Sequence, residues 1–149
     1  MGKLEEAVES YQTAIDIKPD YAEAHSNLGN VLQEMGRLDE AVVSCRKALA
    51  INPEFAGANH NLGIALQGQG ELGEAMASYQ KALTIAPDYA EAHCNLGSVL
   101  KEFGKLDEAL ATYHKALSLK PNYPETHNNI GVALQELGKL KGAVDHYYK

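Results

Sequence analysis

The chain of 149 residues is 45% hydrophobic and 22% charged, which excludes a disordered or low-complexity protein. Thirteen basic against twenty acidic residues give a formal net charge of −7, which disfavours binding to nucleic-acid phosphates, and no apolar run approaches the roughly 20 residues of a membrane-spanning helix. The two cysteines, Cys45 and Cys94, lack a CxxC partner, so we expect neither zinc nor a disulfide framework and favour a reduced, cytoplasmic compartment.

A period of 34 residues runs through the sequence and sets the elements that we expect. Such a period predicts a stacked array of one supersecondary unit, because a single unit cannot bury its apolar face alone. The recurring positions are Gly36, Gly70, Gly104 and Gly138; Pro19, Pro53, Pro87 and Pro121; Leu38, Leu72, Leu106 and Leu140; and Ala41, Ala75, Ala109 and Ala143.

Residues 3–18 are expected to form the second helix of a unit whose first helix is absent, so we interpret the chain as a fragment of a longer protein. Full units follow at 22–55, 56–89 and 90–123, and an incomplete unit covers 124–149. In the first full unit, apolar residues spaced by three and four predict a helix from about His25 that ends at Gly36. A second helix is predicted from about Leu38 to Ala50, ended by Pro53.

Two local patterns complete the unit. A glycine in the middle of each first helix is a poor helix former, so we expect it to face the small residue at the Ala41 position and let the two backbones approach. Pairs resembling capping boxes are expected to begin the first helices. These pairs are Asp20 with Glu23, Asp88 with Glu91, and Asn122 with Glu125.

The unit resembles the tetratricopeptide repeat, in which a large residue, Leu-Gly, Ala, an aromatic residue, Ala and Pro follow in this order. The matching residues are His25, His93 and His127; Leu28-Gly29, Leu62-Gly63 and Leu96-Gly97; and Tyr11, Tyr79, Tyr113 and Tyr147, with Asn59, Ile130 and Cys45 as departures. The resemblance covers the whole chain. It implies an all-α fold, a right-handed α-solenoid superhelix of antiparallel helix pairs with a 34-residue repeat, forming a single array over 1–149.

The histidines do not suggest a metal site. His25, His93 and His127 share one repeat position, which separates successive copies by roughly 10 Å, whereas a zinc ion needs ligand atoms about 2 Å away. We interpret them as filling the slot of a large aromatic residue. The others, which are His60, His114 and His146, are expected on the surface. No catalytic or phosphate-binding motif occurs, so we expect neither an enzyme nor a cofactor.

Asparagine recurs directly before the buried Leu or Ile of each first helix. Two interpretations stay open: an amide ladder that bonds the main chain of an extended peptide, or a structural bond to a neighbouring helix. The series resembles the asparagine ladder of eukaryotic O-GlcNAc transferases, whose repeats often carry Asp where this chain has Glu23, Gly57, Glu91 and Glu125. The candidate residues of a peptide-binding groove are Asn27, Asn61, Asn95, Asn129, Glu23, Glu91, Glu125, Asn30, Ser26 and His60.

The groove is not expected to bind the carboxy-terminal EEVD of heat-shock chaperones. Repeats that do so place Lys or Arg on successive first helices, whereas Lys101 is the only basic residue on any complete first helix here. The many glutamates on those helices would repel a carboxylate.

The sequence therefore indicates a protein–protein interaction scaffold that binds an extended peptide or a partner helix in a concave groove, without catalysis. One alternative is the substrate-selecting repeat region of an O-GlcNAc transferase-like glycosyltransferase. Another is a self-assembling scaffold whose ends stack between chains, because the apolar residues of 3–18 and of the last helix lack a covering unit. At the C-terminal end, the uncovered apolar residues are Leu140, Val144 and Tyr147.

Overall fold

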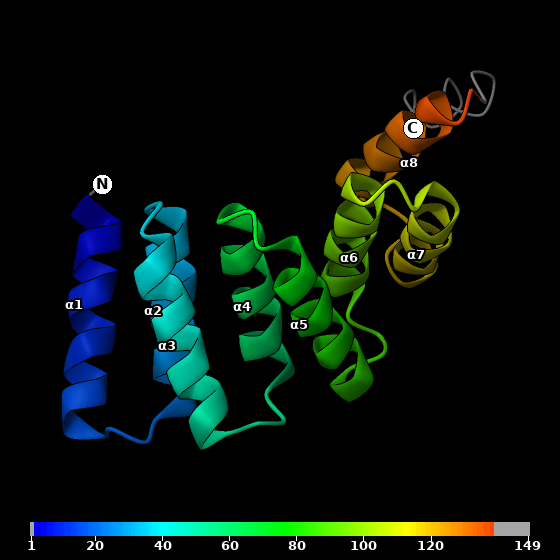
Figure 1. The fold of residues 1–149 in the computed structure, drawn as a ribbon. Helices are drawn as coiled ribbons and strands as arrows, with labels where there is room; N and C mark the ends of the chain where they lie inside the picture. Colours follow the sequence, from blue (N-terminus) through cyan, green and yellow to red (C-terminus); the bar gives the residue numbers. More distant parts are fainter. Residues whose placement is uncertain (1, 139–149) are drawn as a thin grey trace. The chain divides into compact units, whose positions relative to one another are not determined.

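The computed structural model describes residues 2–138, which form α-helices joined by short turns and contain no strand (Figure 1). Each helix pair is antiparallel, because turns of only a few residues reverse the chain between its members. The helices are α1 (Gly2–Ile17), α2 (Ala22–Glu34), α3 (Leu38–Ile51), α4 (Ala56–Gly68), α5 (Leu72–Ile85), α6 (Ala90–Glu102), α7 (Leu106–Leu119) and α8 (Pro124–Glu136).

The helices fall into two compact units. In the first unit, Met1–Ile85, α2 packs on α3 and α4 on α5, while α1 packs on α2, α3 packs on α4, and the first helices α2 and α4 lie side by side. In the second unit, Ala86–Lys149, α6 packs on α7, α7 on α8, and α6 lies beside α8. The fold is an all-α solenoid of helix pairs, as the sequence predicts.

The turn inside each pair depends on a glycine. Gly36 has a φ of +75°, a left-handed conformation that other residues adopt only with strain. Its N–H bonds the carbonyl of Gln33 at 2.9 Å, and the N–H of Arg37 bonds the carbonyl of Leu32 at 2.8 Å. Gly70, Gly104 and Gly138 adopt the same conformation, with φ of 82°, 74° and 71°. The predicted end of the first helix at glycine is confirmed.

The mid-helix glycines allow close approach of the paired helix, but the residue they face differs from the expected one. The sequence suggested the small residue at the Ala41 position, whereas the nearest group is the residue four positions further on, at the aromatic position of the repeat. A Cβ added to Gly63 would lie 2.6 Å from Tyr79 Cε1, and one added to Gly97 would lie 2.6 Å from Tyr113 Cε1. At Gly29, the added Cβ would lie 2.5 Å from Cys45 Sγ, and the Ala41 carbonyl oxygen would be the next atom, at 3.2 Å.

The expected capping boxes do not form. Tyr21, Tyr89 and Tyr123 occupy the N-cap positions, and no side chain caps these helices. A histidine of the first helix instead binds the proline carbonyl of the preceding turn through Nε2, which fixes the turn without help from the carboxylates. The distances are 2.9 Å from His25 to Pro19, 2.8 Å from His93 to Pro87 and 3.0 Å from His127 to Pro121.

Helix α1 is the least buried element of the first unit, since none of its residues is buried. Among residues 2–138, no helix is long and apolar enough to cross a membrane. The residues proposed for stacking at the other end, which are Leu140, Val144 and Tyr147, lie outside the described part of the chain, and so does His146.

Candidate functional site

One stripe of side chains along the first helix of each pair forms the candidate site, which we call the first-helix face. Its members are separated by four, three and four residues, so they share one side of the helix. Asparagine always occupies the second place, and glutamate occupies the first and last places on three helices. The stripe consists of Glu23, Asn27, Asn30 and Glu34 on α2; Gly57, Asn61, Ile64 and Gly68 on α4; Glu91, Asn95, Ser98 and Glu102 on α6; and Glu125, Asn129, Val132 and Glu136 on α8.

In the first unit, the asparagine amide connects neighbouring first helices. Asn61 Nδ2 on α4 lies 3.4 Å from the main-chain oxygen of Ser26 on α2 and 3.2 Å from its hydroxyl oxygen. A main-chain carbonyl only accepts hydrogen bonds, so the NH2 end of Asn61 must point toward α2. The half-buried Asn61 thereby uses its donor end within the protein and leaves Oδ1 as an acceptor.

The second unit repeats this connection between α6 and α8. Asn129 Nδ2 on α8 lies 3.5 Å from Ser98 Oγ and 3.8 Å from Cys94 Sγ, both on α6. The hydroxyl of Tyr113 donates to the same Ser98 oxygen at 3.2 Å, and Thr126 donates to Cys94 Sγ at 3.1 Å. A small polar network therefore joins the first helices at the level of the asparagine.

The asparagine oxygens are accessible. Within residues 2–138, Gln33 Oε1 is the buried side-chain polar atom that has no hydrogen-bond partner. Asn61 Oδ1 and Asn129 Oδ1 are not among such atoms, although the hydrogen bonds described above for both amides are made through nitrogen, so these two oxygens are not fully buried. The structure therefore shows the structural bond for the NH2 groups of Asn61 and Asn129, and binding of a peptide by the oxygens stays a prediction.

The acidic members of the face have different surroundings. Glu23 and Glu125 are exposed, whereas Glu91 Oε1 accepts a hydrogen bond from Lys120 at 2.9 Å. Asn30 is half-buried and donates to Glu34 at 3.0 Å on its own helix. The glutamates that end each stripe were not among the site residues indicated by the sequence. Their signal is the spacing of eleven residues from the first glutamate, repeated on three helices.

Two of the expected groove residues are not at the surface. Ser26 is 2% exposed and His60 is 8% exposed. His60, which the sequence placed on the surface, packs against the Tyr79 ring with 5.9 Å between ring centroids. The aromatic residue on the second helix draws this histidine into the core, so the prediction for His60 was wrong. His114 is exposed, as expected.

Neither cysteine is placed to act as a nucleophile. Burial raises the pKa of Cys45 to about 12, and burial is also the main cause that raises the pKa of Cys94. A reactive cysteine needs a lowered pKa, because the thiolate is the attacking form. No group of three or more His, Cys, Asp or Glu side chains in the described chain could hold a metal ion.

Family models described as TPR repeat match residues 1–36, 68–103 and 97–138, and one described as tetratricopeptide repeat matches residues 22–55. The chain belongs to the tetratricopeptide-repeat family. Proteins of this family are in general interaction scaffolds and not catalysts, so protein binding is the broad class of function. A comparison with curated proteins gives no match.

Solved tetratricopeptide-repeat structures resemble this chain over nearly its whole length. MamA is 27% identical, with a TM-score of 0.87 over 99% of this chain and 86% of its own. The pilF protein of Pseudomonas aeruginosa is 28% identical, with a TM-score of 0.89 over 99% of this chain and 67% of its own. YrrB is 26% identical, with a TM-score of 0.77 over 97% of this chain and 75% of its own.

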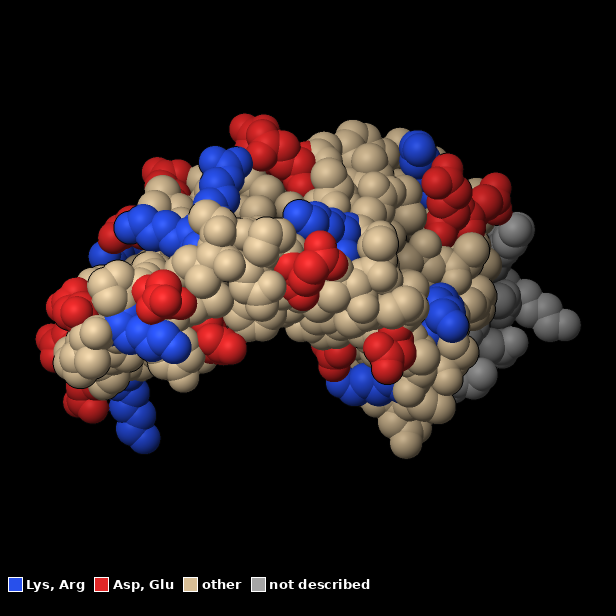
Figure 2. Space-filling view, turned by 90° about the horizontal axis from the view of Figure 1, so that it is seen from below, with Lys and Arg blue, Asp and Glu red and all other residues tan. Residues whose placement is uncertain are grey.

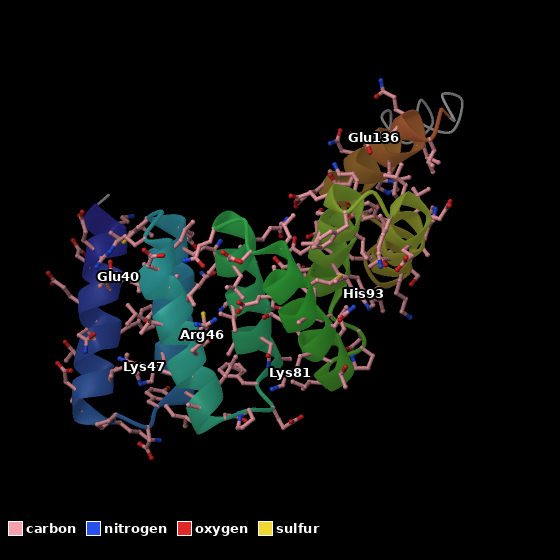
Figure 3. All side chains as sticks on the ribbon, viewed as in Figure 1. Glu40, Arg46, Lys47, Lys81, His93 and Glu136 are labelled. Carbon is pink, nitrogen blue, oxygen red and sulfur yellow. The ribbon has the colours of Figure 1, made fainter. Side chains whose placement is uncertain are left out.

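The first unit of this tetratricopeptide-repeat chain also has a hollow beside α1. It is a groove of about 370 Å³ between α1 and α3, and its apolar lining includes Val8 and Val43. Figure 3 places Lys47 on the side of α3 toward α1, and Lys47 also lines the groove. The equivalent space between α3 and α5 is bridged by Arg46, which binds Glu74 at 2.9 Å. No such bridge links α1 to α3 in the described chain, which leaves the groove open.

Charged side chains elsewhere on the surface are of mixed sign. Figure 2 shows Lys and Arg interspersed with Asp and Glu on the face seen from below, with no large area of a single sign. The exposed ion pairs are of two kinds. Arg37 with Glu40 and Lys105 with Glu108 lie three residues apart, whereas Arg46 with Glu74 and Lys120 with Glu91 join different parts of the chain. This surface therefore does not suggest a nucleic-acid site, in line with the acidic composition.

Proposed function

We propose that this chain is a non-catalytic scaffold that holds an extended peptide along its first-helix face. The observation that carries the proposal is the row of asparagine amides. Each amide observed at Asn61 and Asn129 directs its NH2 group to the neighbouring first helix and has an oxygen that is not fully buried. A fixed acceptor, as on α4 and on α8, suits the main-chain N–H groups of an extended segment, which recur regularly whatever its sequence.

The structural bond strengthens this proposal, because it orients the acceptor before a ligand arrives. A side chain already held in one rotamer loses less entropy on binding, so more of the hydrogen-bond energy appears as affinity. One similar structure points the same way, since YrrB is described as a TPR protein with an unusual peptide-binding site. A free carboxylate remains an unsuitable anchor, because glutamates are frequent on these helices.

The test is selection from a random peptide library, followed by affinity measurement on two amide variants. Asn61→Ala with Asn129→Ala removes two acceptors from the face. One acceptor is lost from each unit, and a lost hydrogen bond is worth about 1 kcal/mol, so a peptide held by either unit should bind on the order of 5-fold more weakly. Gln80→Ala, an exposed amide on the second helix α5, is the matched control and should leave affinity unchanged.

The variants also lose their bonds to the neighbouring helix, so helical circular dichroism and urea unfolding are recorded beside affinity. Weaker peptide binding with retained helix content supports the proposal. Selected peptides that bind the double variant as tightly as the parent chain would show that the face is not the binding site.

A further inference from the structure

We propose that the peptide held by the first-helix face is basic, with Lys or Arg side chains that alternate along it; this inference rests on the proposed function. Two rows of glutamates carry it. In the second unit, Glu91 and Glu125 stand in the first turns of α6 and α8, and Glu102 and Glu136 are the last residues of the same helices. Figure 3 shows Glu136 at the end of α8.

The rows lie on either side of the asparagines. Eleven residues separate the two glutamates of each helix, which corresponds to about 16 Å along the axis. Asn129 lies about 6 Å along α8 from Glu125 and about 10 Å from Glu136. A peptide that crosses the helices at the asparagine row therefore has a line of carboxylates on each side. Alternate side chains of an extended peptide point to opposite sides, and long basic side chains can span such distances.

The helix dipole does not account for the glutamates at the helix ends. Negative charge near a helix C-terminus is disfavoured by the helix dipole, yet Glu34, Glu102 and Glu136 all occupy the last helical residue. A cationic partner would offset this unfavourable placement. Glutamates in the first turn are favoured by the dipole, so Glu23, Glu91 and Glu125 support the proposal less strongly on their own.

The hydrogen-bonding capacity of the face agrees with its charge. The amide of Asn61 has an oxygen that is not fully buried, and carboxylates are acceptors only, so the face mainly accepts hydrogen bonds. Lys101 is the one Lys or Arg on α6 and α8, against four glutamates, of which Glu91 is paired with Lys120. A partner that matches the surface must therefore bring donors and positive charge.

Helix α4 lacks both glutamates, so it offers no acidic side chain of these rows to a basic residue of the partner. Gly57 and Gly68 stand where the other first helices carry the two glutamates. The side of Gly68 is occupied by the Leu38 side chain, whose Cδ1 would lie 3.0 Å from an added Cβ. We therefore assign the contacts to basic side chains mainly to the second unit, on α6 and α8.

The experiment compares four short peptides by fluorescence anisotropy, at low and at physiological ionic strength. The first alternates Lys with Thr, the second has the same composition with its lysines contiguous, and the third and fourth replace Lys by Gln or by Glu. Glu125→Gln with Glu136→Gln tests the two rows. Glu9→Gln with Asp107→Asn changes the net charge equally at exposed positions away from the face.

We expect the alternating Lys peptide to bind the parent chain most tightly. Its affinity for the variant Glu125→Gln with Glu136→Gln should be roughly ten-fold lower, and its affinity for the control variant should be less than two-fold lower. Two results would overturn the inference: an equal loss of affinity in both variants, or equally tight binding of the contiguous Lys peptide. Either would mean that the acidic chain attracts basic peptides in general, without a specific arrangement of glutamates. Tighter binding of the Gln or Glu peptide would also overturn the inference while leaving the scaffold proposal intact. Failure of every peptide, including those selected from the random library, would instead overturn the proposed function itself.

Discussion

Gln33 and Gln67 occupy the same position of the repeat, but within residues 2–138 only Gln67 has a hydrogen-bond partner on the second helix. We therefore expect the substitution of each by methionine to have opposite effects on the free energy of unfolding. In the second full repeat, the hydroxyl of Tyr79 donates to Gln67 Oε1 at 3.0 Å. In the repeat before it, Cys45 stands at the tyrosine position and Gln33 at the glutamine position. The hydroxyl is missing there, and Gln33 Oε1 is buried with no hydrogen-bond partner.

Methionine matches glutamine in length but has no strong acceptor. A buried polar group without a partner costs about 1–3 kcal/mol, so Gln33→Met should stabilise the first unit by about 1 kcal/mol once partial exposure of the side chain is allowed for. Gln67→Met instead deletes a hydrogen bond to the fully buried Tyr79 and should destabilise the unit by about 1 kcal/mol. The two variants are therefore expected to differ by about 2 kcal/mol.

Urea unfolding followed by circular dichroism measures both free energies, and Gln80→Met, on the exposed side of α5, provides the control. The control should stay within about 0.5 kcal/mol of the parent chain. The reasoning is refuted if Gln33→Met and Gln67→Met change stability in the same direction, because burial of the side chain would then outweigh its hydrogen bonding.

Three further predictions concern packing, pH and ion pairs. Gly63→Ala should destabilise by about 1–2 kcal/mol, because overpacking against the Tyr79 ring exceeds the gain in helix propensity, whereas Gly73→Ala, with open space around it, should be neutral or stabilising by thermal unfolding. The thiol of Cys45 has its pKa raised from 9.0 to about 12 in the folded chain, so the unfolded chain ionises first and stability should fall by about 1.4 kcal/mol per pH unit across that window. Urea titrations at several pH values should show this slope reduced in Cys45→Ala. Arg46→Ala should change the unfolding free energy by less than about 1 kcal/mol, because its ion pair is exposed.

The repeat period made the helix pairs predictable, because glycine with a positive φ and proline mark every turn. The entry to each first helix was not predictable in the same way. Asp20 and Glu23 have the spacing of a capping box, yet His25 binds the Pro19 carbonyl and leaves Tyr21 at the N-cap. Sequence spacing identifies groups that can bond, but not whether the folded backbone brings them together.

The glycine contacts show a related limit. Helical spacing places Gly63 opposite the second helix, but whether the Ala75 or the Tyr79 position lies nearest depends on the crossing geometry of the two helices. The structure puts the tyrosine ring there. The same ring draws His60 into the core, and a sequence pattern that treats each side chain alone cannot anticipate this pairing.

The positions of the asparagines could be predicted from the sequence, but not the direction of their amides. The asparagine row follows from the period, whereas the direction of each amide depends on groups 35 residues away, as between Asn61 and Ser26. In the proposed function, that direction decides what the face can bind. An amide that presented its NH2 group would favour an acceptor-rich ligand, while an exposed oxygen beside carboxylates favours a donor-rich, basic one. The hydrogen bond between neighbouring repeats therefore stabilises the stack and at the same time sets the polarity of its surface.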